Sequence, residues 1–105
     1  MIHVTTTCDT VETARALARS ALQARLVACA NISPGILSLF HWRGAVDEEE
    51  EVAITFKTVE THREALIALI TREHPYDLPV ITWATVGTTE EAEAWCREET
   101  TARPE

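Results

Sequence analysis

The sequence contains few of the residues on which disulfide-stapled or zinc-stapled small folds depend. It has only three glycines and three cysteines in 105 residues, and no two cysteines form a C-x-x-C pair. An odd, widely spaced cysteine set argues against a disulfide framework, and the missing pair argues against zinc-ribbon and thioredoxin-like folds. We therefore expect Cys8, Cys29 and Cys96 to be reduced and structural.

Basic residues are also scarce. Acidic residues outnumber Lys and Arg by 17 to 9, the formal net charge is −8, and Lys57 is the only lysine. Nucleic acids and anionic membranes require a basic face, so neither is an expected partner. No apolar run approaches the roughly 20 residues that cross a bilayer, and the first residues lack the features of a signal peptide. These absences predict a cytoplasmic protein.

Hydrophobic patterning predicts one domain over residues 1–105, built from alternating strands and helices. Capping-box patterns are expected to start the first two helices, with Asp9 and Thr61 as N-caps. The expected elements are a strand at 2–7, a helix at 11–25, a strand at 26–42 bent at Pro34-Gly35, its partner strand at 46–58, a helix from 61 that ends before Pro75, a strand at 78–86, and a short helix after 88.

This order, β-α-β-β-α-β plus a terminal helix, is typical of the ferredoxin-like split βαβ fold in the α+β class. Its helices cover one face of an antiparallel sheet, so the other face meets solvent, ligand or another subunit. The long hairpin keeps many apolar side chains that do not alternate cleanly with polar ones: Ile36, Leu37, Leu39, Phe40, Trp42, Val52, Ile54 and Phe56. An apolar patch of that size predicts a homo-oligomer.

Two segments are candidates for cation chemistry. His74 follows the second helix, where it is either a metal ligand beside Glu73 or a cap that interacts with the helix dipole. The run from Asp47 to Glu51 holds five consecutive acids. Alternate strand residues point to opposite faces, so these acids cannot converge on one ion, and we interpret them as a solvated flank of the hairpin.

Other residues leave alternatives open. Lys57 stands at a strand end, where it either meets an anionic ligand or forms an ordinary salt bridge. Trp42, Trp83 and Trp95 either stack on a ligand or anchor a core or interface. No nucleophile motif is present, and Cys29 lies within an apolar segment, so no enzymatic activity is expected.

Four segments together resemble the CutA family of divalent-cation tolerance proteins over roughly residues 2 to 98. The first, Ala24 to Gly35, is similar to the family segment E-x-R-L-A-A-C-V-N-I-x-P-G. The others are Ser38 to Gly44, similar to S-x-Y-x-W-x-G; Glu51, Lys57 and Thr58, similar to E-x-x-x-x-x-K-T; and His74 to Pro79, similar to H-P-Y-x-x-P. Their order and spacing agree with the family pattern.

The resemblance implies a tight homotrimer, similar in architecture to PII signalling proteins, that is linked to tolerance of copper and other divalent cations without catalysis. Copper-binding relatives use a first-strand cysteine and paired histidines, which correspond here to Thr6, Glu73 and His74. A common family glutamate is Val80 here, and a common tyrosine is Phe40.

The resemblance also leaves two alternative functions. In a PII-like small-molecule sensor, clefts between subunits would be lined by Lys57, Trp42 and Tyr76. In a trimeric interaction scaffold, the assembled surface would present itself to another protein.

Overall fold

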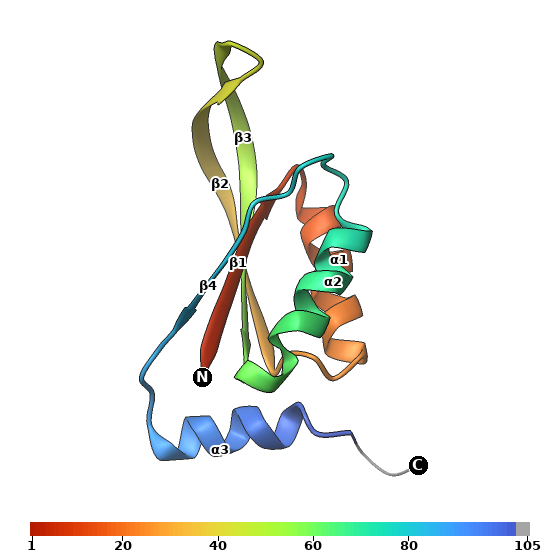
Figure 1. Cartoon of the computed structure of the whole chain (residues 1–105), viewed down its shortest axis with the longest axis vertical. Helices are drawn as coiled ribbons and strands as arrows, with labels where there is room; N and C mark the ends of the chain where they lie inside the picture. The colour runs from red at the N-terminus through yellow and green to blue at the C-terminus, as the bar shows by residue number, and fades with distance from the viewer. Residues whose placement is uncertain (103–105) are drawn as a thin grey trace.

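Four antiparallel strands form one sheet in the order β2-β3-β1-β4, with α1 and α2 beside one another and α3 lying across one end (Figure 1). The computed structural model describes residues 1–102. In chain order its elements are β1 (Ile2–Cys8), α1 (Val11–Gln23), β2 (Cys29–Trp42), β3 (Ala45–Thr58), the 3₁₀ turn η1 (Glu60–His62), α2 (Arg63–Glu73), β4 (Ile81–Thr85) and α3 (Glu90–Glu99). The predicted α+β class is confirmed.

The core lies between the sheet and the helices α1 and α2. Strand β1 alternates buried and half-buried residues along its whole length, as expected for a strand with one covered face. Helix α1 buries Ala14, Leu17, Ala18 and Ala21, whose spacing of three and four places them on one stripe. The largest completely buried side chain is Phe56, which packs in one cluster with Val4, Leu17, Ile54, Leu66 and Ile70.

Strands β2 and β3 form a hairpin of 14 residues a side that extends well beyond the helices (Figure 1). Its pairing runs from Cys29–Lys57 to Trp42–Ala45, with a register shift between Ser33 and Ile36. The shift occurs at the predicted bend, because Pro34 has no N–H to donate. At the tip, Arg43 and Gly44 have φ of 51° and 82°, the left-handed pair that a two-residue hairpin turn requires.

The hairpin does not distribute its apolar residues as the sequence suggested. Val52, Ile54 and Phe56 face the helices and belong to the core, so they contribute nothing to an open face. Beyond the bulge, however, Leu37 and Leu39 each remain 62% exposed. No described element covers this half of the hairpin, which is where an unpartnered apolar surface remains.

Two of the expected helix caps were wrong. The N-cap of α1 is Thr10, whose Oγ1 accepts from the Thr13 amide at 3.1 Å, while Asp9 accepts from the Thr10 amide instead. Thr61 lies inside η1, and α2 starts after His62 with no side-chain cap. The 3₁₀ turn therefore occupies the position that the capping-box pattern assigned to the helix start.

Two strand starts also differ from expectation. Helix α1 ends at Gln23 and is followed by a left-handed residue, Arg25 (φ 59°), and the chain reaches the sheet only at Cys29 rather than at residue 26. Strand β4 begins at Ile81, after Pro79, and pairs only with β1. A proline cannot donate to a ladder, so the stretch 78–80 stays outside regular pairing.

All three cysteines are free, with Cys8 and Cys96 buried and Cys29 half-buried. Burial raises the pKa of the Cys8 and Cys96 thiols, which keeps them protonated at neutral pH. Within residues 1–102, no helix combines the length and the apolar character that crossing a membrane requires.

Candidate functional site

His74 caps α2 and joins it to β1. Its Nε2–H donates to the carbonyl oxygen of Thr7 at 2.8 Å, and its Nδ1 accepts from the Tyr76 amide at 3.1 Å. The ring is 7% exposed, and its centroid lies 4.7 Å from that of Tyr76. Because both ring nitrogens have backbone partners, the imidazole is held in one tautomer and has no free lone pair for a metal ion.

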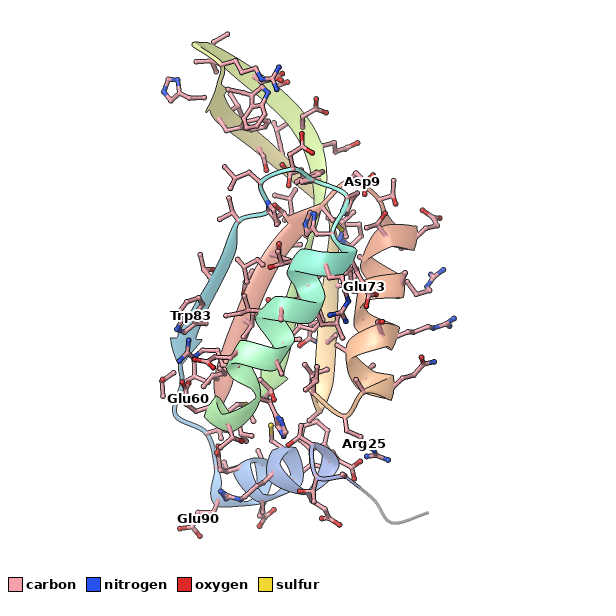
Figure 2. All side chains as sticks on the ribbon, turned by 45° about the vertical axis from the view of Figure 1, so that its right-hand side comes forward. Asp9, Arg25, Glu60, Glu73, Trp83 and Glu90 are labelled. Carbon is pink, nitrogen blue, oxygen red and sulfur yellow. The ribbon has the colours of Figure 1, made fainter. Side chains whose placement is uncertain are left out.

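Thr6 and Glu73 also have partners within the protomer. The buried Thr6 hydroxyl donates to the Val80 carbonyl oxygen at 2.9 Å, which ties the approach to β4 onto β1. The Glu73 carboxylate accepts from the Ser20 hydroxyl at 3.0 Å and lies 3.7 Å from Arg72. Figure 2 shows Glu73 and Asp9 at the same end of the helical layer, where the chain leaves α2.

These contacts decide how well the three predicted ligands fit a metal ion. Thr6 and His74 hold the same segment, residues 74–80, against β1, whereas Glu73 binds to α1. Among residues 1–102, no three His, Cys, Asp or Glu side chains are arranged to hold a metal ion. The donors as they stand do not fit a metal centre, and the metal site at these residues stays a prediction.

A cavity of about 860 Å³ opens between the outer half of the hairpin and the segment 75–80. Trp42 and Tyr76, two of the three residues expected in a ligand cleft, line it, and Lys57 does not. Lys57 pairs with His3 and Cys29 at the opposite end of β3. The lining residues are Thr7, Asp9, Ser38, Phe40, His41, Trp42, Asp47, Glu49, Glu51, Pro75, Tyr76, Asp77, Leu78 and Val80.

The cavity is acidic and aromatic. Its lining includes five carboxylates and no Lys or Arg. Burial, together with the charges of Glu51 and Asp9, raises the pKa of Tyr76 to about 12. A tyrosine resists ionisation in this way when it is partly desolvated and its neighbours are already negative.

Glu51 is the residue whose environment differs most from the sequence interpretation. It was expected on a solvated flank, but it is only 8% exposed, and its Oε2 is buried without a hydrogen-bond partner. The available signal was its place directly before Val52, where β3 enters the covered part of the sheet. The acidic run is therefore not uniform, because its last member is buried and the others are exposed.

The tryptophans do not form a common site. Trp42 lines the cavity, Trp83 lies on β4 with the Arg63 guanidinium 4.9 Å from its ring centroid, and Trp95 is 44% exposed on α3. Trp83 is labelled on the edge strand in Figure 2.

Comparison with known proteins identifies the family. Residues 2–99 match the family described as CutA1 divalent ion tolerance protein. The chain belongs to the CutA1 family. The resemblance found in the sequence is thereby confirmed, and CutA1 proteins are named for tolerance of divalent cations rather than for a reaction.

Individual CutA1 relatives agree with this membership. A curated relative is the divalent-cation tolerance protein CutA of Pectobacterium atrosepticum, 39% identical over 66 residues that cover 63% of this chain and 60% of that protein. Matched segments thus span about three fifths of the length of such curated relatives.

Solved CutA1 structures match nearly the whole chain. The crystal structure of CutA1 from Pyrococcus horikoshii is 35% identical, with a TM-score of 0.92, and the match covers 97% of this chain and all 100% of that one. A structure from Archaeoglobus fulgidus, named as a periplasmic divalent cation tolerance protein CutA, is 27% identical with a TM-score of 0.92 over 96% of this chain and 100% of that one.

Proposed function

We propose that this CutA1 protein acts in the cellular response to divalent cations such as Cu(II), as a cytoplasmic, ferredoxin-like, PII-like homotrimer without catalytic activity. The observation that carries the proposal is the family match over residues 2–99, since the family is named for divalent-cation tolerance. The absence of a nucleophile motif from the sequence supports a non-catalytic role.

The trimer is supported by the outer half of the hairpin. Leu37 and Leu39 are 62% exposed, and Leu78 and Val80 are 69% and 67% exposed on the facing segment. Exposed apolar side chains gathered on one part of a small soluble protein mark an interface. Strands β2 and β4 are the two edges of the sheet, so each offers backbone groups to a sister subunit.

Direct metal binding is proposed at His74, Glu73 and Thr6, on the strength of the resemblance alone. It requires the His74 ring to leave either the Thr7 carbonyl oxygen or the Tyr76 amide, because both ring nitrogens are engaged. His74 is therefore expected to contribute to the fold whether or not it binds a cation.

The proposal is tested in the cell and in solution. A strain that lacks the gene should grow poorly in raised Cu(II), and the wild-type gene should restore growth. In solution, Cu(II) titrated by calorimetry should bind the wild-type protein and the variant His41→Ala equally, and bind His74→Ala at least tenfold more weakly. Equal binding by all three removes His74 from the site. Unchanged growth of the deletion strain argues against the tolerance role.

A further inference from the structure

One face of the acidic run forms a wall of the cavity. Asp47, Glu49 and Glu51 all line it, whereas Glu48 and Glu50, on the opposite face of β3, do not. Asp9, directly after β1, and Asp77 add two further carboxylates to the lining. With no Lys or Arg among the lining residues, these charges are not neutralised within the cavity.

One carboxylate oxygen of Glu51 lacks a hydrogen-bond donor. Its Oε2 is buried, and no donor reaches it from the described residues. A buried carboxylate oxygen without a hydrogen bond is costly, so such groups in native proteins are normally paired. Because Glu51 lines the cavity, a ligand there can supply the missing donor.

The spacing of the carboxylates favours an extended ligand. Successive residues on one face of a strand lie about 6.6–6.8 Å apart, too far for Asp47, Glu49 and Glu51 to share one ion at the short distances that metal ligands need. A linear aliphatic polyamine carries ammonium groups separated by short methylene chains, which place successive charges at a comparable spacing. Such a chain can meet these carboxylates one after another.

Aromatic rings stand beside the carboxylates. Phe40 pairs with Asp47 across the hairpin, and Ser38 pairs with Glu49. Trp42 and Tyr76 also line the cavity. Aromatic faces attract ammonium groups and pack against methylene chains, so rings and carboxylates that line the same cavity provide both kinds of contact.

We propose that the cavity between the hairpin and residues 75–80 binds a linear aliphatic polyamine, with Glu51, Glu49 and Asp47 pairing with its ammonium groups. The proposed ligand is a cation, whereas Lys57 was considered as a contact for an anionic ligand, and Lys57 lies outside the cavity. Leu37 and Leu39 pair with Glu50 and Glu48, so they lie on the opposite face of the hairpin from the acidic wall of the cavity. The site is independent of the proposed tolerance role, and each can fail without the other.

The test is calorimetric titration of the wild-type protein with spermidine at low and at physiological salt. Saturable binding of one spermidine per protomer is expected, weaker at higher salt because charge pairing is screened. The variants Glu51→Gln and Glu49→Gln should each weaken binding about tenfold, through loss of one charge-assisted contact.

Glu48→Gln and Glu50→Gln are the matched controls, since they remove the same charge from the opposite face of the same strand and should change affinity less than about twofold. Equal weakening by all four variants, or no saturable binding by the wild type, overturns the proposal. Glu49 is exposed, so its variant tests the site even where Glu51→Gln disturbs folding. The oligomeric mass of Glu51→Gln should equal that of the wild type. If this mass changes and the wild type does not bind spermidine, the cavity is occupied by a second copy of the chain, and the polyamine proposal is overturned.

Discussion

The imidazole of His74 donates from Nε2 to the backbone carbonyl oxygen of Thr7 at 2.8 Å, across 67 positions of sequence. This bond joins the end of α2 to β1, while the second ring nitrogen of His74 accepts from the Tyr76 amide. Together with the Thr6–Val80 hydrogen bond, His74 thus holds residues 74–80 against β1, and this segment forms one wall of the cavity.

Replacing His74 should therefore destabilise the metal-free protein. His74→Ala leaves the half-buried Thr7 carbonyl and the Tyr76 amide without their side-chain partner, which we expect to lower the free energy of unfolding by about 2 kcal/mol. Urea unfolding without metal measures the change, with the exposed His41→Ala as control. If His74→Ala were as stable as the wild type, the positioning role would be wrong.

Tyr76 provides a pH-dependent prediction. Burial first, and then the charge of Glu51, raises its pKa to about 12 in the folded state. An unfolded chain ionises this group near the ordinary value of about 10, so the contribution to stability is complete below pH 10 and is lost as the pH rises through 12. Absorbance of tyrosinate should report the folded pKa directly, because Tyr76 is the only tyrosine.

Glu51→Gln should lower that Tyr76 pKa toward its ordinary value, because it removes the largest negative charge effect on the phenol. The same absorbance titration measures this, and Glu48→Gln serves as its control. An unchanged Tyr76 pKa in Glu51→Gln would mean that burial alone accounts for the shift.

The core should depend on Phe56 more than on the apolar residues of the outer hairpin. Phe56 is completely buried, so Phe56→Ala should cost about 3–5 kcal/mol of stability. Val46 is 67% exposed, and Val46→Ala should change stability by less than about 0.5 kcal/mol. Denaturant unfolding of both variants gives the comparison, and similar losses would contradict the position of the core.

The outer hairpin should instead control assembly. Leu37→Asp combined with Leu39→Asp places charge on the exposed apolar strip, which should reduce the particle to single chains while each chain keeps its secondary structure. Light scattering measures the mass, and circular dichroism measures the folding. A wild-type mass of one chain at micromolar concentration would contradict the proposed trimer itself.

Most elements could be predicted because their causes are local. The stripe from Ala14 to Ala21, the proline after α2 and the Pro34-Gly35 bend each act within a few residues. Two helix caps were wrong where local signals compete: Thr10 and Asp9 are both good caps before the same helix start at Val11, and a 3₁₀ turn absorbs Thr61. The short helix expected after residue 88 is present as α3, with Thr89 as an N-cap that accepts from the Ala92 amide.

The candidate site was only partly predictable. His74, Tyr76 and Trp42 could be singled out from motifs, but the acidic run looked uniformly solvated. Whether an acidic side chain on a strand is buried depends on which other segment packs over it. Here segment 75–80 lines the same cavity as Glu51 although it lies far from Glu51 in sequence. The periodicity of a strand carries no information about such a contact between distant segments.

The sequence by itself determined the succession of strands and helices, the bend of the hairpin and membership of the CutA1 family, because short-range patterns and motifs carry all three. Only the tertiary structure decided that Lys57 lies away from the cavity and that Glu51 lies buried in its wall without a partner. The reason is that the sheet order β2-β3-β1-β4, and the hydrogen bonds of Thr6 and His74 that hold residues 74–80, join segments separated by dozens of residues.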